Sequence, residues 1–189
     1  MIIGILGEDI SDAETIKAII GRLGLKRLNE MKPLGFGGRS KLLNDGANKA
    51  KVMRALHGVT HLVVCHDSDG REPEGVRERV TKHVVNPSGF ADSHCLAIPV
   101  RMIEAWIAAD PEAIRAVIPC FECPLHPSPE QLEDPKKWLI GEARLAGSRG
   151  RYRPATHNSQ IAQWLDIDLV ASRCESFARF RRCVMQWAT

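Results

Sequence analysis

The stretch that most constrains the fold of this chain runs from Thr60 to Gly70. It contains a short apolar run, Leu62–Cys65, which is typical of a strand buried on both faces of a parallel sheet. Asp67 and Asp69 follow at the carboxyl end of this strand, where open α/β sheets bind their ligands. Neighbouring carboxylates repel each other unless water or a cation separates them, and hard divalent ions prefer such oxygen ligands. The pattern predicts a metal site or, alternatively, a polar turn, because Asp, Ser and Gly all favour turns.

The rest of the amino-terminal half alternates short apolar runs with amphipathic segments. Further strands are expected at residues 2–6, 31–34 and 94–98. Helices are expected at residues 11–23, 40–57 and 72–85, where apolar side chains recur at helical spacing. Strands that alternate with helices in this way indicate βαβ units. The predicted fold class is α/β: a Rossmann-like, mainly parallel sheet of about four strands flanked by helices, with a helical C-terminal extension.

Two more acids follow predicted strands. Glu8 comes after the first strand, and a capping-box pattern at residues 11–14 begins the next helix. Glu104 follows the last strand, three positions after Arg101, in a helix expected at residues 100–107. Because the carboxyl ends of parallel strands share one edge of a sheet, both acids can join the two aspartates. The alternatives are stabilisation of a helix dipole by Glu8 and a surface ion pair between Arg101 and Glu104.

Candidate phosphate-binding arginines occur in three parts of the chain. The first part contains Arg39 alone, the second contains the trio Arg149, Arg151 and Arg153, and the C-terminal part contains Arg179, Arg181 and Arg182. Arg39 ends a glycine-rich loop, residues 35–38, which lacks the Walker and dinucleotide patterns and predicts a turn from which Arg39 can face a phosphate. The trio surrounds Tyr152, which suits phosphate contacts by arginine and base stacking by tyrosine. A solvated basic loop is the alternative interpretation of that segment.

Composition narrows the classes of protein. The 189 residues are 44% hydrophobic and 26% charged, as in an ordinary globular protein with one buried core. A net charge of +3 does not identify a nucleic-acid partner, so that argument depends on where the charges lie. The apolar start turns acidic without a basic region, which predicts a first strand in place of a signal peptide, and no apolar run approaches membrane-spanning length. A cytoplasmic protein without a membrane partner is expected.

The cysteines allow two interpretations. They are Cys65, Cys95, Cys120, Cys123, Cys174 and Cys183. Cys120, Cys123 and His126 have the spacing of half a zinc site. The two C-terminal cysteines would have to supply the other half by coming close in space. Reduced thiols are the favoured interpretation, with the cysteines of the expected strands acting as small apolar side chains.

The chain divides at a proline-rich stretch that lacks periodicity, residues 118–135. We expect an α/β core over residues 1–117 and a helical extension over residues 118–189, packed on the core as a single compact unit. Helical patterns in the extension cover residues 136–145, 158–165 and 176–187.

Four motifs carry a resemblance to a known family. They are Gly7-Glu8 before a capped helix, His66-Asp67-Ser68-Asp69, Ile98–Trp106 and Ser176–Phe180. On these motifs, residues 1–110 resemble a TOPRIM domain, the metal-binding α/β module of topoisomerases, primases and OLD-type nucleases. The whole chain is similar to a family of small bacterial TOPRIM-like proteins related to OLD-type nucleases, which are often considered alongside ATPase-linked phage-defence systems.

The resemblance implies a metal-dependent nuclease. Glu8, Asp67 and Asp69 would bind Mg²⁺ or Mn²⁺, and Glu104 would be an auxiliary catalytic acid. Metal-assisted phosphodiester hydrolysis needs no protein nucleophile. The expected partners are nucleic acid, DNA in the first place, and a separate ATPase subunit. The candidate nucleic-acid contacts are Arg39, Arg101, Arg149, Arg151 and Arg153.

Two other functions stay open at this point. One is a non-catalytic TOPRIM-like partner or binding module, and the other is a hydrolase or transferase of small nucleotides. Acids that converge and accept a cation favour catalysis, whereas acids locked to nearby arginines favour the binding module.

Overall fold

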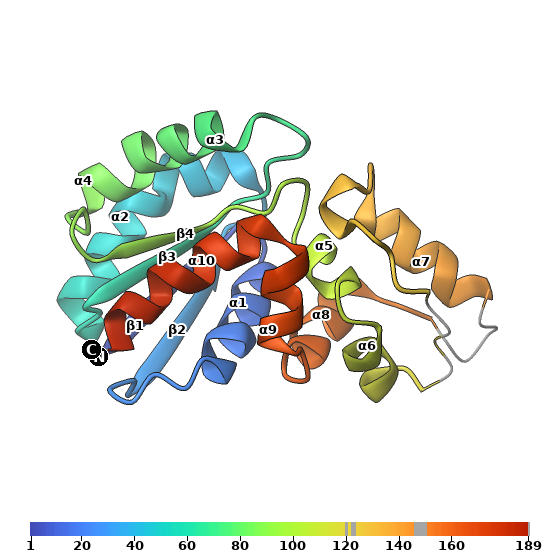
Figure 1. Cartoon of the computed structure of the whole chain (residues 1–189). Helices are drawn as coiled ribbons and strands as arrows, with labels where there is room; N and C mark the ends of the chain where they lie inside the picture. The colour runs from blue at the N-terminus through green and yellow to red at the C-terminus, as the bar shows by residue number, and fades with distance from the viewer. Residues whose placement is uncertain (120, 122–123, 146–150, 189) are drawn as a thin grey trace.

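The computed structural model describes residues 1–119, 121, 124–145 and 151–188. Its centre is a four-stranded parallel sheet in the order β2-β1-β3-β4 (Figure 1). The strands are β1 (Ile2–Gly7), β2 (Glu30–Gly35), β3 (His61–Cys65) and β4 (His94–Ala97). All four expected strands form, and the predicted α/β, Rossmann-like fold class is confirmed.

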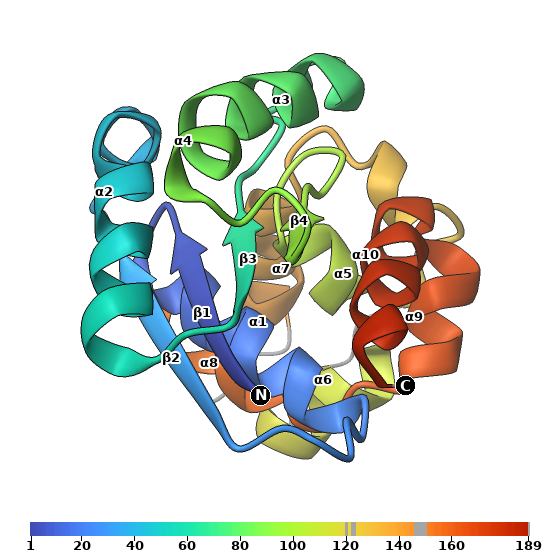
Figure 2. The same cartoon turned by 90° about the vertical axis from the view of Figure 1, so that its left-hand side faces the viewer.

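Helices cover both faces of the sheet (Figure 2). One layer holds α2 (Arg39–His57), α3 (Pro73–Val80), a π-helical turn (Thr81–Val85) and α4 (Asn86–Ser88). The other side holds α1 (Ile10–Arg22), α5 (Glu104–Ala108), α6 (Pro111–Val117), α7 (Pro135–Leu145), α8 (Pro154–Ala162), α9 (Ile167–Arg173) and α10 (Glu175–Met185). Short 3₁₀ turns lie at Pro129–Gln131 and Gln186–Ala188. No helix in the described part of the chain is long and apolar enough to cross a membrane.

The alternation of side chains along the strands creates two cores. In β3, Leu62 and Val64 belong to the core beneath α2 and α3, whereas Val63 and Cys65 belong to the core that includes α1 and α10. Successive residues of a strand point to opposite faces, so an apolar run buried on both faces is what a central parallel strand requires. The central stretch was therefore interpreted correctly from its sequence.

The C-terminal extension contacts the core around one tryptophan. The ring of Trp106 in α5 stacks on Phe180, 5.8 Å between centroids, and meets Phe177 edge-on at 5.2 Å. Its Nε1 donates a hydrogen bond of 2.8 Å to Ser176 Oγ. All four side chains are buried. The segments Ile98–Trp106 and Ser176–Phe180, distant in the sequence, thus form one packed unit.

Two local predictions are corrected, and one helix was missed. Helix α1 is capped by Asp9, whose backbone amide donates to Asp12, so the capping box spans residues 9–12 and begins two positions before the predicted one. The helix expected at residues 100–107 begins only at Glu104, because Pro99 and Arg101 give their carbonyls to the turn after β3. Helix α9 was not predicted; its seven residues are too short for a clear apolar period.

One cysteine pair contradicts the prediction of reduced thiols. Cys95 of β4 and Cys183 of α10 form a disulfide with Cα atoms 5.9 Å apart. They are separated by 88 residues in the sequence, and only the packing of α10 beside β4 brings them together. Cys65 and Cys174 are free and buried, as predicted for reduced thiols.

The half zinc site is only partly described. Cys120 and Cys123 lie outside the described residues. Nδ1 of His126 accepts a hydrogen bond of 3.2 Å from the Ser128 amide. Cys183 is in the disulfide and Cys174 is buried beside the Ala105 carbonyl, so these two cysteines do not form the other half of a zinc site together.

Candidate functional site

The carboxyl ends of β1 and β3 bring Glu8 and Asp67 together. The chain leaves β1 toward one side of the sheet and returns as β3 on the other, which creates a switch point where α/β sheets bind ligands. Glu8 Oε1 accepts a hydrogen bond of 3.1 Å from the Asp67 amide. The two acids are 59 positions apart in the sequence, and the strand order alone makes them neighbours.

The turn after β3 is fastened to the segment after β4. The Ser68 amide donates to the Pro99 carbonyl at 3.3 Å and the Asp69 amide to the Arg101 carbonyl at 2.9 Å. Asp67 Oδ1 in turn accepts from the Ile103 amide at 3.2 Å. These bonds fix the Asp67 side chain and direct the chain into α5, which begins with Glu104.

Asp69 faces a different partner. Its Oδ2 lies 2.7 Å from Nη1 of Arg39, an ion pair without hydrogen-bond alignment. Asp69 has a φ of 50° and Gly70 a φ of 75°, so the turn bends sharply through the left-handed region. A Cβ at Gly70 would collide with the Arg101 guanidinium, which lies over it. Arg39 therefore lies beside the acids, with Asp69 as its present partner.

The glycine-rich loop is held by Glu8. The Glu8 carbonyl accepts hydrogen bonds from the amides of Phe36, at 3.2 Å, and Gly38, at 2.8 Å. A Cβ at Gly35 would collide with the backbone of Ile10. The loop can approach the start of α1 only because glycine is there, and this approach places Arg39 at the site.

Glu104 reaches the same edge from α5, where it is 5% exposed. Its Oε1 accepts a hydrogen bond of 3.2 Å from Asn158 Nδ2, and Asn158 Oδ1 accepts from the Tyr152 hydroxyl. Tyr152 is itself 5% exposed, so the prediction that it stacks on a base is wrong. The hydroxyl needs a partner when the ring is buried, and the chain Tyr152–Asn158–Glu104 supplies it. Tyr152 positions an acid of the site.

A fifth acid was missed from the sequence. Asp12, in the first turn of α1, accepts a hydrogen bond of 3.0 Å from the Asp9 amide. Repulsion between carboxylates links Asp12 to both Asp67 and Glu104. Its position in the first helical turn after Glu8 was the available signal. We call Glu8, Asp12, Asp67, Asp69 and Glu104 the acid cluster.

Burial and mutual repulsion raise pKa values across the acid cluster. Burial, opposed by the Asp67 amide and assisted by repulsion from Asp69, raises the pKa of Glu8 to about 7. Burial and repulsion from Glu104 raise the pKa of Asp12 to about 6. The pKa of Asp67 lies well above its usual value, because of burial and then repulsion from Asp12 and Glu104. Burial also raises the pKa of Glu104. These raised pKa values favour the protonated carboxyls, because gathering the full negative charge of the cluster is costly without a cation.

His66 is buried beside Glu8. Its Nδ1 lies 2.8 Å from the Asp67 carbonyl and 3.2 Å from Glu8 Oε1, and since both oxygens only accept, Nδ1 carries the proton. Burial lowers the pKa of His66, which favours the neutral ring. In the described residues, His66 Nε2 and Ser68 Oγ are buried without a hydrogen-bond partner. His66 thus hydrogen-bonds to the Asp67 carbonyl and lies against the Glu8 carboxyl group.

The carboxylates of the acid cluster are the residue type that binds a divalent cation. Their side chains are not, however, arranged as a formed metal site. Buried carboxylates with raised pKa values are stabilised when a hard cation binds their oxygens. Within the described ranges, no group of three or more His, Cys, Asp or Glu side chains is arranged to hold a metal ion. The Arg39–Asp69 pair and the Asp67–Ile103 bond occupy oxygens that a cation would need. Binding would require side-chain rearrangement in the acid cluster.

The remaining predicted arginines have different surroundings. Arg151 and Arg153 are exposed on either side of Tyr152 and so lie next to the chain of hydrogen bonds that ends at Glu104. Arg149 lies outside the described residues. The C-terminal arginines each pair with an acid: Arg179 with Glu74, Arg181 with Asp168 and Arg182 with Glu175. These pairs reduce the positive charge expected of the C-terminal surface.

Comparison with protein families gives one match. Residues 13–184 match the family model of a domain of unknown function, DUF4276. The chain belongs to this family. The match includes three members of the acid cluster, Asp67, Asp69 and Glu104, and begins after Glu8 and Asp12. No curated protein and no solved structure matched the chain. The DUF4276 assignment carries no activity with it, so function has to be argued from the site.

Proposed function

We propose that this DUF4276 protein is a nuclease that depends on Mg²⁺ or Mn²⁺ and hydrolyses phosphodiester bonds. The observation that supports this is the convergence of five carboxylates, four with raised pKa values, at the switch point of a parallel sheet. Holding such charges together costs stability in the free protein, and a divalent cation would offset that cost. The TOPRIM resemblance of the sequence agrees with this function.

The roles of the residues follow from their contacts. Glu8, Asp67 and Asp69 are the proposed metal ligands, with Asp12 and Glu104 as auxiliary acids. A bound cation would neutralise phosphate charge and activate water for attack. Arg39 is placed to bind a phosphate oxygen once Asp69 turns toward the metal, because its guanidinium forks onto phosphate readily. His66 lies against the Glu8 carboxyl group and would help to keep it in position.

The proposed substrate is a nucleic acid, with DNA as the first choice. Arg101 lies over Gly70 at the site, and the exposed Arg151 and Arg153 flank Tyr152 beside Glu104. These three arginines suit contacts with a phosphate backbone that extends away from the acids. We propose a separate ATPase subunit of a phage-defence system as the partner, from the sequence resemblance, and the cytoplasm as the location.

A binding module without catalysis is the second candidate. The ion pair between Arg39 and Asp69 supports this candidate, because a fixed pair would keep a cation away from Asp69. Arg39 and Asp69 are partly exposed, with side-chain exposures of 30% and 40%, and such pairs exchange readily with other partners. We therefore place catalysis first.

Cleavage assays test the proposal. Supercoiled plasmid, linear DNA and labelled RNA are incubated with the protein and Mg²⁺ or Mn²⁺, in parallel with Asp67→Asn and the control Asp45→Asn on the exposed surface of α2. The proposal predicts cleavage by the wild type and the control and none by Asp67→Asn. Cleavage that survives in Asp67→Asn would assign it to a contaminant. Metal binding without cleavage of any polymer would favour the binding module or a small nucleotide substrate.

A further inference from the structure

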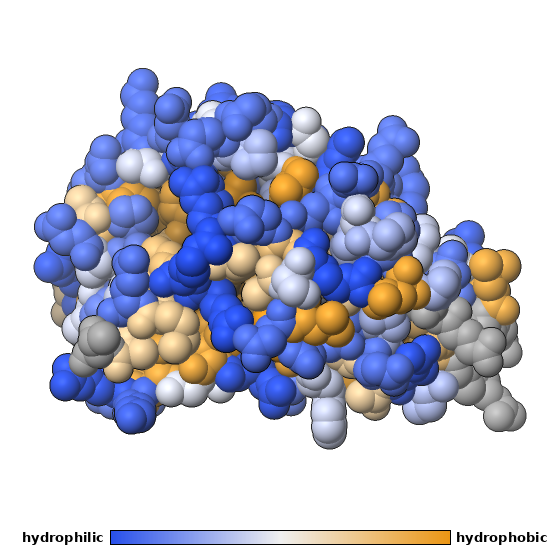
Figure 3. Space-filling model, in the orientation of Figure 1, coloured by the Kyte–Doolittle hydropathy of each residue, from blue (hydrophilic) through white to orange (hydrophobic). Residues whose placement is uncertain are grey.

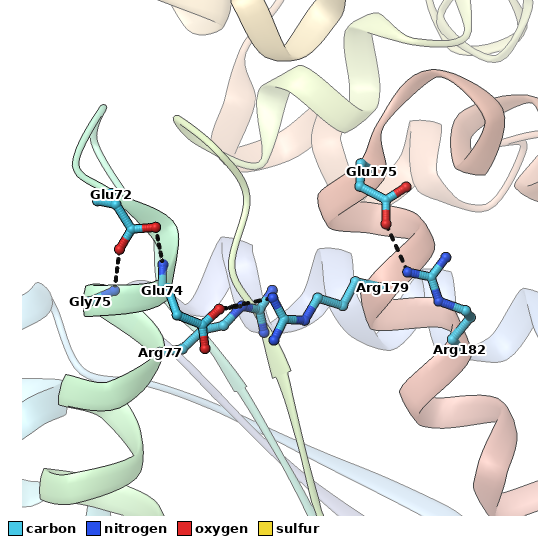
Figure 4. A network of polar contacts seen from close by, with 7 residues as sticks. All are labelled: Glu72, Glu74, Gly75, Arg77, Glu175, Arg179 and Arg182. Atoms are coloured by element: carbon cyan, nitrogen blue, oxygen red, sulfur yellow. Dashed lines mark hydrogen bonds and ion pairs between the residues drawn. The ribbon is translucent and has the colours of Figure 1, made fainter.

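The second charged feature of the molecule lies over the edge strand. Helices α3 and α10 flank β4, and Arg77 of α3 and Arg179 of α10 extend toward each other across it (Figure 4). Beneath them is a cavity of about 260 Å³, which Thr81, His94 and the Cys95–Cys183 disulfide also line. Sites for drug-sized ligands span about 300–1,000 Å³, so this cavity suits a small ligand.

The cavity has more positive than negative charge. Glu74 is the one acid among its described lining residues. Its Oε2 lies 3.0 Å from Arg179 Nη1 and 3.9 Å from Arg77 Nε, so a single carboxylate serves two guanidinium groups. The nearby acids are engaged elsewhere: Glu72 caps the start of α3, and Glu175 pairs with Arg182 (Figure 4).

Arg77 is the unsatisfied member of this arrangement. It is 9% exposed, and its Nε has no hydrogen-bond partner among the described residues. The guanidinium loses its hydration when the protein folds. A buried charge without a close partner lowers the stability of the folded protein. Burial, followed by repulsion from Arg179, lowers the pKa of Arg77. An anion that enters the cavity would therefore bind without further desolvation of this guanidinium.

We propose that this cavity binds a phosphate group through Arg77 and Arg179, at a site separate from the acid cluster. A terminal phosphate carries a charge of about −1.5 to −2 at neutral pH, which matches two arginines once Glu74 has been displaced. Glu74 can leave because its side chain is 55% exposed and can be hydrated outside the cavity. Arginine is the side chain best suited to phosphate oxygens because its donors form a planar fork.

The surface around the cavity agrees with a polar ligand. Figure 3, in the orientation in which α10 lies in front of the sheet, shows a continuous hydrophilic band that crosses this face between apolar patches. Arg179 is exposed on α10 and Glu74 on α3, at either side of the cavity. A phosphate can thus approach the cavity from solvent, where the exposed Glu74 carboxylate would have to make way for it.

Calorimetric titration with inorganic phosphate, in EDTA and at constant ionic strength, tests the site in the full chain. Glu74→Gln removes the internal competitor and is expected to tighten binding several-fold. Arg179→Gln is expected to weaken it at least tenfold. The control is Arg182→Gln, which changes an arginine of the same helix paired with Glu175 outside the cavity. A purely structural bridge predicts the reverse for Glu74→Gln, namely loss of stability and no phosphate binding, and that result would overturn the proposal.

Two further arms identify the source of the phosphate and separate this site from the nuclease proposal. Binding of an oligonucleotide that requires its 5′-phosphate would assign the site to a nucleic-acid terminus, and binding of inorganic phosphate alone would assign it to a free anion. Failure of both overturns the site. Asp67→Asn is expected to bind phosphate as the wild type does, so loss of nuclease activity in that variant leaves this test unaffected.

Discussion

The two charged regions of this protein are opposites: one has more acidic groups than basic partners, and the other has more basic groups than acidic partners. The acid cluster gathers five carboxylates at the carboxyl edge of the sheet, with Arg39 as the direct ion-pair partner of one of them. The arginine pair, Arg77 and Arg179, shares one carboxylate over the edge of β4. Burial raises the pKa of the carboxylates and lowers that of Arg77, because in both regions it disfavours the charged form.

The opposite charges of the two regions indicate what each region can bind. Uncompensated charge that folding keeps buried is relieved by a ligand of opposite sign, a cation at the acid cluster and an anion at the arginine pair. Both regions also contain an internal substitute for the ligand: the Arg39 guanidinium at the acids and the Glu74 carboxylate at the arginines. Variants that remove a charge or its substitute should therefore affect one region and leave the other unchanged.

The largest effect is expected from Asp67→Asn. The Asp67 carboxylate accepts from the Ile103 amide and the Asp67 amide donates to Glu8, which fixes this acid at the centre of the cluster. Its loss should lower the rate of metal-dependent cleavage by about 10³-fold, or about 4 kcal/mol. Single-turnover cleavage at saturating Mg²⁺ measures the effect. Phosphate binding at the arginine pair should not change. Equal loss at both sites would mean that the variant is misfolded and that the regions are not independent.

The second effect concerns the disulfide. Reduction of Cys95–Cys183, or Cys183→Ser, should lower the free energy of unfolding by about 2–4 kcal/mol, because the bond closes a long loop. Cys183 lies one turn after Arg179 on α10, so phosphate binding should weaken as well. Denaturation with and without reductant measures the stability, and Cys65→Ser is the control for a cysteine outside the bond. Unchanged stability on reduction would show that packing alone holds α10 on β4.

The third effect is a change in pH dependence. Glu8 loses its proton near pH 4.5 in the unfolded chain and near pH 7 in the folded protein. Folding therefore takes up a proton between these values, and this carboxyl makes stability fall as the pH rises through that window. Glu8→Gln removes the loss, so at pH 8 the variant should be more stable than the wild type by about 3 kcal/mol.

At pH 4 the two proteins should unfold alike, since the Glu8 carboxyl is then protonated in both states. Mg²⁺ should stabilise the wild type at pH 8 and have little effect on Glu8→Gln. Glu14→Gln, which removes a surface carboxylate paired with Lys17, is the control. If the stability of the wild type and of Glu8→Gln changed in parallel over the whole pH range, the pKa of Glu8 would not be raised by folding.

The smallest effect is expected from Arg39→Gln. The ion pair with Asp69 is partly exposed, so its loss should change stability by less than about 1 kcal/mol. Freed from Arg39, Asp69 should bind Mg²⁺ a few-fold more tightly, while the Michaelis constant for nucleic acid rises because a phosphate contact is lost. Calorimetry and steady-state kinetics measure the two changes. Unchanged metal affinity would indicate that Asp69 is not a ligand, and would favour the binding module.

The fold could be predicted from local patterns. The apolar run Leu62–Cys65 and the alternation of strands and helices are short-range signals, and all four strands formed as expected. Glu8, Asp67 and Glu104 could be assigned to one edge of the sheet because parallel strands share their carboxyl ends. The sequence was sufficient to place a residue wherever its position depends on the strand that it directly follows.

Features that depend on contacts between distant elements could not be predicted. The Cys95–Cys183 bond requires α10 to lie on β4, and the burial of Tyr152 requires Asn158 and Glu104 to be its neighbours. Asp12 was overlooked because a helical acid near an N-terminus has an ordinary explanation in the helix dipole. The arginine pair spans two helices about a hundred residues apart, and no sequence spacing records it.

The metal site is tested by calorimetric titration of Mg²⁺ and Mn²⁺ into the wild type and into Asp67→Asn/Asp69→Asn at pH 8. We expect the wild type to bind the metal and to release protons as it does so, because carboxyl groups with raised pKa values ionise when a cation binds. The double variant should bind neither ion. Absence of metal binding by the wild type, at concentrations that saturate known carboxylate sites, would contradict a catalytic acid cluster and leave a binding module.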